Sequence, residues 1–429
     1  MKKYLPLALL LTLGFLLRVV FAHLNQSGDL FVFLEWGRKF WEYGGKNYYF
    51  GSENVWKYAP PNYPPLSMLL FGGLDWLFQH KYVLAHLHNL IRIPPAAFIV
   101  YFYKYGDIFL IKLPSILADL GIGLIIYRLV GNLGGGKKKA LIGAGLYLLN
   151  PISIFISSIW GQTDSLVAFF GLLAFVFLYY KKAHLSIPLL FVSLYLKPSW
   201  ATLIPFYLFA LYIYRPKLKQ ILMGGVISLV IFLLATVPFA DRNPFAYATH
   251  LTTERLWYGA KGTGRASVSA FNFHSLFFKI DRDYRNVRLA GIKSDTWGLI
   301  FYLALNFLAF KYFSKNKKLF GLISSIFIIS TGSFLFLTNM LERYFYPALP
   351  SMVVMMVISP RVTLEIAISN LLLFANLIWS FYRRRFDEID HPFTNNNFLL
   401  IRLLSLLNLL IFFRVLKNLK AFVLQSKGG

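Results

Sequence analysis

The sequence predicts an all-α protein that crosses a membrane many times. Hydrophobic residues make up 57% of the 429 residues, aromatic residues 18% and charged residues only 14%. A soluble globular chain carries about a quarter of charged residues, so this composition is typical of a chain surrounded by lipid. Apolar runs such as 5–22, 221–237 and 319–337 are long enough to cross a bilayer as helices.

The charge pattern argues against a nucleic-acid-binding protein. The net charge is +26, from 44 Lys and Arg residues against 18 Asp and Glu residues. On a soluble domain such a charge would suggest nucleic acid as a partner. Here the basic residues lie mainly in short loops between apolar runs, where they set orientation and attract anionic lipid headgroups. We therefore expect membrane lipids as partners and no nucleic acid.

The first apolar run, 5–22, follows Lys2 and Lys3 and is expected to remain as a membrane helix. No small-residue cleavage site followed by a soluble domain comes after it, as a cleaved signal peptide would require. The chain contains no cysteine. A disulfide framework and a thiolate metal site are therefore ruled out.

Lysine clusters allow the apolar runs to be threaded through the membrane in order. With Lys2 and Lys3 in the cytoplasm, the first run leads to an outer loop at 23–64, and later crossings place the longest polar stretch, 240–295, outside. Every strong lysine cluster then lies inside, whereas Arg383-Arg384-Arg385 lies outside. The predicted crossings are 5–22, 66–78, 82–103, 108–130, 141–159, 166–180, 185–196, 201–214, 221–237, 297–310, 319–337, two around Pro360-Arg361, and 398–413.

This threading gives about 14 membrane helices, and one pair of runs has an alternative. The run 82–103 contains His86, His88, Arg92 and a Pro94-Pro95 step, and it can instead lie flat on the membrane. In that case 66–78 does not cross either, because the later loops fix the parity, and about 12 helices cross. The chain shows neither an internal repeat nor a shift in composition, so residues 1–429 are expected to form one domain.

The first outer loop is expected to hold an amphipathic helix lying in the plane of the membrane surface. Leu30, Phe33 and Trp41 recur at helical spacing, with charged residues on the opposite side. Asp29 comes immediately before this helix. The segment alone favours Asp29 as the N-cap, and the alternative is a catalytic carboxylate at the membrane surface. The proline-rich stretch 58–65 cannot be helical, so it is a stiff connector or lines a cavity.

Five short motifs follow one another along the chain. They are Gly28-Asp29 with Tyr63-Pro64-Pro65-Leu66, Lys112-Leu113-Pro114 with Ala118-Asp119, Asn150-Pro151 before Trp160-Gly161-Gln162-Thr163-Asp164, Lys197-Pro198, and Met340-Leu341-Glu342-Arg343-Tyr344 before Pro347. Together they resemble the integral membrane glycosyltransferases of the GT-C superfamily, over most of the chain up to about residue 350. Leu341 departs from this pattern, because many relatives have a histidine there, and any role of that imidazole is absent or supplied elsewhere.

The resemblance implies a GT-C-like helix bundle and an inverting hexosyltransferase, similar to a mannosyltransferase. The implied donor is a sugar on a polyprenyl phosphate, and the acceptor is a hydroxyl of a lipid- or protein-linked glycan; no cofactor or metal is expected. Asp29 is the implied general base. Because the leaving phosphate gathers negative charge, Arg343 and Lys197 are the predicted phosphate-binding residues. The other predicted substrate-binding residues are Tyr63, Trp160, Gln162, Asp164 and Glu342.

Some of these residues also have a structural interpretation. Lys197 can instead extend its charge to the membrane surface, with Pro198 opening the next helix. Arg343 can form a local pair with Glu342. Asp164 can cap the helix that follows it, and capping is the safer interpretation.

Three further polar sites are expected to be structural. Asp119 lies within a predicted span, so it is expected to pair with Lys112 or Arg128, or to be neutral. Asp281-Arg282-Asp283 superficially resembles a metal-binding motif, but it lies among arginines and is expected to be solvated surface. His274 is expected to be buried against aromatic neighbours rather than to bind a ligand.

Two other functional classes stay open. A lipid-linked glycan polymerase or ligase would use related donor chemistry. A secondary transporter or lipid flippase would show paired halves with interrupted helices and polar residues near mid-membrane. Here the polar clusters gather at one face and no halves match. We expect a protein of the cell membrane, and so of the cell envelope, with a cytoplasmic N-terminus and an extracytoplasmic site.

Overall fold

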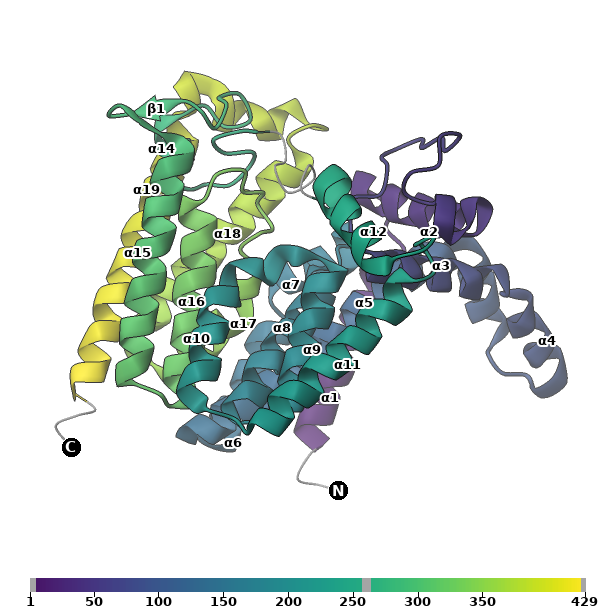
Figure 1. The fold of residues 1–429 in the computed structure, drawn as a ribbon, viewed down its shortest axis with the longest axis horizontal. Helices are drawn as coiled ribbons and strands as arrows, with labels where there is room; N and C mark the ends of the chain where they lie inside the picture. The colour runs from purple at the N-terminus through teal and green to yellow at the C-terminus, as the bar shows by residue number, and fades with distance from the viewer. Residues whose placement is uncertain (1–4, 257–263, 426–429) are drawn as a thin grey trace.

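In the computed structural model, the chain is a bundle of tilted helices with shorter helices and loops packed over one end (Figure 1). The structure describes residues 5–256 and 264–425. Seven of the described helical segments are long and apolar enough to cross a membrane, and four shorter ones are apolar as well. Strands in this part of the chain are confined to β1 (Arg288–Leu289) and β2 (Ile292–Lys293). The predicted fold class, an all-α polytopic membrane protein, is confirmed.

The bundle combines long helices with short ones. The long helices are α1 (Leu5–Ala22), α5 (Ala96–Val130), α11 (Leu218–Thr236), α15 (Ser294–Lys315), α16 (Leu319–Phe336), α18 (Thr363–Tyr382) and α19 (Asp387–Gln425). The shorter helices are α6 (Gly136–Leu148), α7 (Pro151–Ile154), α8 (Asp164–Tyr179), α9 (Ala183–Leu196), α10 (Ile204–Tyr214) and α17 (Leu349–Ile358). Helix α19 is interrupted by non-helical residues at 395–398.

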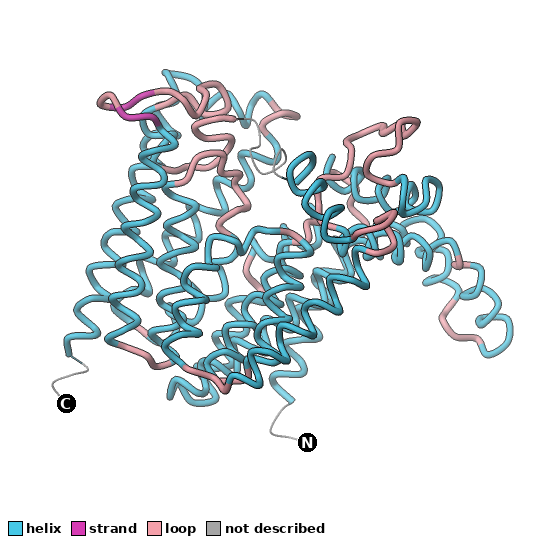
Figure 2. The backbone as a smooth tube through the Cα atoms, in the orientation of Figure 1, coloured by secondary structure: helices cyan, strands magenta, loops and turns pink. Residues whose placement is uncertain are grey.

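The cap over one end of the bundle contains α2 (Gly28–Asn47), α3 (Pro65–Gln79), α12 (Pro244–Leu251), α14 (Phe273–Phe277) and the β1–β2 hairpin (Figure 1). The start of α1 and the end of α19 lie at the opposite end of the bundle. The loops that join α10 to α11 and α15 to α16 lie at that opposite end too (Figure 2). These loops carry lysine clusters that the predicted threading places in the cytoplasm. The lysine-rich turns and the cap therefore lie at opposite ends of the bundle.

Short segments of tighter or wider helix connect the main elements. The π-helical segments are η2 (Gly131–Gly135), η3 (Phe155–Trp160) and η5 (Thr252–Leu256). The 3-10 segments are η4 (Pro198–Leu203), η6 (Tyr346–Ala348) and η7 (Pro360–Val362), and each has a proline in its first turn. Proline is favoured there because its missing N–H would be unpaired in any case.

The chain between residues 66 and 130 differs from the predicted threading. The predicted span 82–103 is broken into α4 (Tyr82–Ile91), a turn, and the first residues of α5. Helix α5 then continues without a break for 35 residues, a length of about 50 Å that exceeds the roughly 30 Å of a hydrocarbon core. The prediction of one span over 82–103 and a second over 108–130 is therefore wrong. Figure 1 shows α4 projecting sideways, away from the bundle.

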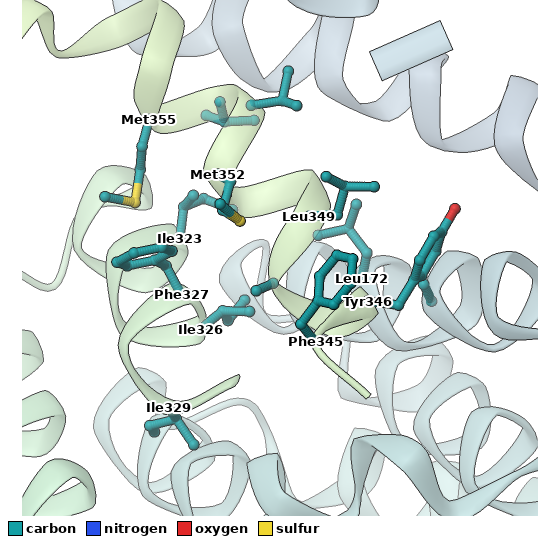
Figure 3. Close-up of a cluster of buried hydrophobic side chains, with 14 of the residues drawn as sticks. Leu172, Ile323, Ile326, Phe327, Ile329, Phe345, Tyr346, Leu349, Met352 and Met355 are labelled. Atoms are coloured by element: carbon teal, nitrogen blue, oxygen red, sulfur yellow. The ribbon is translucent and has the colours of Figure 1, made fainter. Parts of the chain in front are cut away.

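The core of the bundle is centred on α16. Every residue of α16 is buried, as expected for a helix surrounded by other helices on all sides. Ile323, Ile326 and Phe327 of α16 pack with Met352 of α17 and Leu172 of α8 in one hydrophobic cluster (Figure 3). Helix α11, by contrast, has few buried side chains, as expected for a helix that faces lipid.

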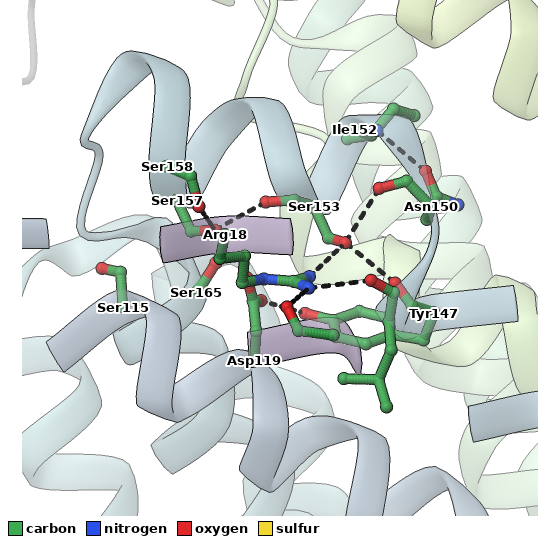
Figure 4. Close-up of polar contacts among 12 residues, drawn as sticks. Arg18, Ser115, Asp119, Tyr147, Asn150, Ile152, Ser153, Ser157, Ser158 and Ser165 are labelled. Atoms are coloured by element: carbon green, nitrogen blue, oxygen red, sulfur yellow. Dashed lines mark hydrogen bonds and ion pairs between the residues drawn. The ribbon is translucent and has the colours of Figure 1, made fainter. Parts of the chain in front are cut away.

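A network of buried polar groups crosses the interior (Figure 4). Arg18 donates from Nε to Asp119 Oδ2 at 2.9 Å, and both side chains are fully buried. The hydroxyls of Tyr147 and Tyr346 donate to Asp119 Oδ1 at 2.8 and 3.0 Å. Arg18 also donates to the carbonyl of Leu148 at 2.8 Å. The predicted partners of Asp119, Lys112 and Arg128, are therefore wrong, because an arginine of the first helix takes that place.

Candidate active site

Asp29 is not the cap of the helix that carries it. Ser27 is the N-cap of α2, and its side chain accepts a hydrogen bond from Leu30 N at 3.4 Å. Asp29 lies in the first turn, where the positive end of the helix dipole favours a carboxylate. The predicted capping role is therefore wrong. The carboxylate instead accepts hydrogen bonds at Oδ2 from Trp160 Nε1 at 3.0 Å and from Gln162 Nε2 at 2.5 Å.

The turn that brings Trp160 and Gln162 to Asp29 depends on Gly161. This residue has φ of 81° and follows directly after η3. A Cβ atom at Gly161 would lie 3.0 Å from Lys112 Cε and 3.2 Å from Leu30 Cδ1. Glycine is favoured here for two reasons, because a side chain would meet these contacts and because the left-handed backbone is strained for other residues. The turn ends at Asp164, the first residue of α8.

Helix α5 anchors two segments of the site, the one that leads to Asp29 and the one that leads to Trp160. Lys112 Nζ donates to the carbonyls of Leu24 at 2.5 Å and Ser158 at 2.7 Å. One turn later, Ser115 Oγ donates to the carbonyl of Gln162 at 2.8 Å. Leu24 precedes Asp29 and Ser158 precedes Trp160, so these bonds fix the ends of the two segments that meet. Lys112 is fully buried.

Arg343 brings positive charge to Asp29. Its NH2 atom lies 3.5 Å from Asp29 Oδ2, and its NH1 atom lies 3.0 Å from Glu342 Oε1. The guanidinium carbon is 5.0 Å from the centre of a Trp160 ring, a cation–π distance. Burial acts to lower the pKa of Arg343, but the nearby carboxylates of Asp29 and Glu342 outweigh it and raise the pKa above its usual value. The guanidinium therefore stays charged.

The local pair of Arg343 with Glu342 is thus present together with the contact to Asp29. Glu342 is buried, and its Oε2 atom accepts hydrogen bonds from the hydroxyls of Ser269 and Ser380, the latter at 2.8 Å. Sequence reasoning missed both serines. Neither stands in a motif, and the hydroxyls lie 73 and 38 residues from Glu342 along the chain. Glu342 thus contacts Arg343 through Oε1 and is itself held by the two serines through Oε2.

Lys197 and Asp164 form a second charged pair beside the first. Lys197 Nζ lies 2.8 Å from Asp164 Oδ2, and both side chains are buried. Lys197 therefore does not extend to the membrane surface, although Pro198 opens η4 as expected. Asp164 makes no capping hydrogen bond, and Thr163 occupies the N-cap position of α8, so the predicted capping role of Asp164 is wrong.

Tyr63 links the two charged pairs. Lys197 Nζ lies 5.5 Å from the centre of the Tyr63 ring. Burial raises the pKa of the Tyr63 phenol, and the charges of Arg343, Asp164 and Asp29 all act on it as well. The phenol therefore stays neutral. The structure thus brings together all the predicted site residues, which come from five separate parts of the chain.

Asp29 is the accessible carboxylate of this cluster. Its side chain is 39% exposed, whereas that of Arg343 is 13% exposed and that of Asp164 is 1% exposed. All the hydrogen bonds and ion pairs of Asp29 among the described residues fall on Oδ2. Its Oδ1 atom is left without a protein donor in this part of the chain.

Three consecutive residues beside Asp29 each keep one buried oxygen without a hydrogen-bond partner in the described chain. They are Gln162 through Oε1, Thr163 through Oγ1 and Asp164 through Oδ1. A buried polar atom left unpaired costs about 1–3 kcal/mol. Three at one place are completed either by ordered water or by a bound group with polar donors. Thr163 was not predicted, although it stands inside the Trp160 to Asp164 motif.

The other polar sites considered in the sequence lie outside this cluster. Asp281 pairs with Arg383 at 3.0 Å and Arg384 at 3.5 Å, so it is held in ion pairs rather than simply solvated. His274 is buried and its Nε2 atom lies 2.7 Å from the carbonyl oxygen of Phe336. Across residues 5–256 and 264–425, no group of three His, Asp or Glu side chains is placed to hold a metal ion.

Comparisons with known proteins add no relative to this description. No model of a known protein family matches the chain, and no curated protein matches its sequence. The resemblance to GT-C glycosyltransferases therefore rests on the five motifs and their order.

Proposed function

We propose that this protein is an inverting glycosyltransferase that moves a hexose from a polyprenyl-phosphate donor to an acceptor hydroxyl. The observation that carries the proposal is the half-exposed carboxylate of Asp29, held at one oxygen by Trp160 and Gln162 with Arg343 beside it. A partly exposed base next to a partly buried cation suits attack on a phosphate-linked carbon. The two groups have distinct roles in such a reaction.

Asp29 acts as the general base. The acceptor hydroxyl gives its proton to Asp29 as its oxygen bonds to the anomeric carbon, and a base within hydrogen-bond reach lowers this barrier. The three groups on Oδ2 fix the orientation of the carboxylate, and Oδ1 is free of protein donors among the described residues. Oδ1 is therefore the atom proposed to take the proton. Attack from the side opposite the leaving group inverts the anomeric carbon.

Arg343 stabilises the leaving phosphate. The bond between the anomeric carbon and the phosphate oxygen breaks with its electron pair on the phosphate, so the negative charge there grows. A preorganised guanidinium in a partly buried site stabilises that charge and can bind two phosphate oxygens at once. Lys197 is the second proposed phosphate-binding residue, although in this structure its charge is paired with Asp164.

The sugar is proposed to lie beside the Trp160 to Asp164 turn. The unpaired oxygens of Gln162, Thr163 and Asp164 are buried hydrogen-bond acceptors, to which ordered water or, once the turn opens to the substrate, sugar hydroxyls can donate. Trp160 and Tyr63 add aromatic faces next to these oxygens. This support is independent of the charge argument.

The proposed site faces the outside of the cell membrane. The lysine-rich turns lie at the end of the bundle opposite to the cap, and the positive-inside rule assigns that end to the cytoplasm. Nucleotide sugars are cytoplasmic, so an outward-facing enzyme of the cell envelope needs a donor delivered through the lipid. A lipid- or protein-linked glycan is the proposed acceptor.

The proposal is tested by supplying the purified protein in nanodiscs with a panel of polyprenyl-phosphate hexoses and a membrane extract as the source of acceptors. We expect release of polyprenyl phosphate from at least one donor, with transfer of its sugar and inversion at the anomeric carbon. No release from any donor, or sugar movement across the bilayer without cleavage, would contradict the proposal.

A further inference from the structure

A lateral arm extends from the side of the bundle and serves no purpose in the proposed chemistry. It consists of the end of α3, all of α4 and the first turns of α5, residues 76–105. Figure 1 shows α4 beyond α2 and α3, at the edge of the molecule. None of the residues of α4 is buried.

The arm is held in a defined shape. Lys81 Nζ lies 4.1 Å from the centre of the Phe78 ring and 5.6 Å from that of Tyr103. The rings of Tyr82 and Tyr103 meet edge to face at 5.6 Å. These contacts join α4 to the start of α5. The exposed face of the arm is thus a property of a folded element.

The exposed surface of the arm is strongly apolar. Leu90 is 65% exposed, and Val100 is 69% exposed. So many large apolar side chains exposed on one short element are unfavourable in water and mark a contact with lipid or with another protein. The other large hydrophobic residues exposed on the arm are Trp76, Leu77, Tyr82, Val83, Leu87, Ile91, Ile93 and Phe98.

The charge of the arm selects between these partners. No acidic residue occurs between Asp75 and Asp107, whereas Lys81, Arg92 and Lys104 all lie in that interval. Apolar surface flanked by basic and aromatic residues is typical of elements that lie in the headgroup region of an anionic bilayer. A shallow hollow lined by Ile99, Val100, Tyr103 and Lys104 opens on the arm. It combines two aliphatic side chains with one cation, as an acyl chain and its phosphate require.

We infer that the lateral arm inserts into the bilayer beside the bundle and binds anionic phospholipids through Arg92 and Lys104. This site is separate from the cluster around Asp29. It gives the protein a preference for anionic lipid that does not depend on the sugar-transfer proposal.

The test uses the fact that the chain has no cysteine. Leu90→Cys is labelled with a polarity-sensitive fluorophore in nanodiscs that contain spin-labelled phosphatidylglycerol or spin-labelled phosphatidylcholine. Leu13→Cys on the exposed face of α1 is the lipid reference, and Arg384→Cys, whose native side chain is 78% exposed, is the water reference. We expect Leu90→Cys to be quenched like Leu13→Cys, and about twofold more by phosphatidylglycerol than by phosphatidylcholine.

Charge reversal separates the two parts of the inference. Arg92→Glu with Lys104→Glu is expected to remove the preference for phosphatidylglycerol while quenching remains. Lys137→Glu with Lys138→Glu, at the lysine-rich end, is the matched control and is expected to keep the preference. Three results would each overturn the inference. The first is fluorophore emission at Leu90→Cys like that at Arg384→Cys, and the second is equal quenching by both lipids without the charge reversal. The third is protection from both quenchers in nanodiscs that hold two copies of the protein, which would mean that a second copy covers the arm.

Discussion

Arg343 and Asp29 contact each other, and each has a separate role in the proposed reaction. Three groups hold Oδ2 of Asp29, so the carboxylate has one orientation. Arg343 is oriented in turn by Glu342, which is itself fixed by two serine hydroxyls. A cation held in this way needs little rearrangement when negative charge forms beside it, which is the condition for electrostatic catalysis.

This arrangement predicts that the geometry of Arg343 matters as well as its charge. Arg343→Lys keeps the charge but loses the planar fork, so we expect sugar transfer to fall about tenfold. Arg343→Gln removes the charge and is expected to lower transfer by about 10²- to 10³-fold. Steady-state rates with the lipid-phosphate donor measure both effects. Arg384→Gln, at an exposed arginine of the same end, is the control and should leave the rate unchanged.

The partners of single residues were harder to predict than the residues themselves. Ser27 and Asp29 are both good N-cap residues and stand two positions apart, so sequence alone could not decide which one caps α2. Arg18 stands alone among apolar residues in the sequence, and its partner Asp119 lies 101 residues away. Local patterns show which residues are unusual for their surroundings. The pairing between distant residues depends on the packing of the helices.

Helix α5 is the element that organises the site. Three residues of α5 follow one another at helical spacing. Lys112 contacts the segment after α1, Ser115 the Trp160 to Asp164 turn, and Asp119 contacts Arg18. The sequence predicted the apolar character of this region and the positions of many helices, such as α1 at 5–22 and α16 at 319–336. It did not predict that α5 continues outward to Ala96, because an apolar run has the same composition whether the helix breaks or continues.

Loss of Lys112 should disturb the site through its backbone. In Lys112→Met the carbonyls of Leu24 and Ser158 lose a shared buried donor, so the segments that carry Asp29 and Trp160 are no longer tied together. We expect transfer to fall at least about tenfold in kcat, with a donor KM within about twofold of wild type, and a lower unfolding temperature. Arg128→Met removes an exposed basic residue in the last turn of the same helix and serves as the control.

A normal turnover number in Lys112→Met, or an equal loss in Arg128→Met, would show that α5 does not position the site. Partial recovery of kcat in Lys112→Arg would support it, because a guanidinium can also donate to the two carbonyls.

At the scale of the whole molecule, charge and shape agree on two distinct ends. Asp29 belongs to α2 of the cap, and the lysine-rich turns lie at the opposite end of the bundle (Figure 1). The basic residues of the cap are partly neutralised, since Arg383 and Arg384 share Asp281. One aspartate shared by two arginines leaves the cluster basic, so the proposed outer placement of Arg383-Arg384-Arg385 still runs against the positive-inside rule.

This assignment predicts opposite labelling of the two ends in intact cells. The chain has no native cysteine, so a single introduced cysteine reacts without background. Arg384→Cys should react with a membrane-impermeant maleimide from outside, and Lys138→Cys should react only after the membrane is permeabilised. The reverse pattern would place the proposed site in the cytoplasm and remove the reason for a lipid-linked donor.

The most direct test of the proposed function compares two aspartates of the same end. Asp29→Asn keeps the size of the side chain and removes the base, whereas Asp107→Asn makes the same change at an aspartate paired with Arg38, outside the site. With the donor identified from the panel, we expect Asp29→Asn to lower sugar transfer at least about a hundredfold with an unchanged unfolding temperature, and Asp107→Asn to keep wild-type transfer. Wild-type transfer by a folded Asp29→Asn protein would contradict the role of this carboxylate and the mechanism built on it.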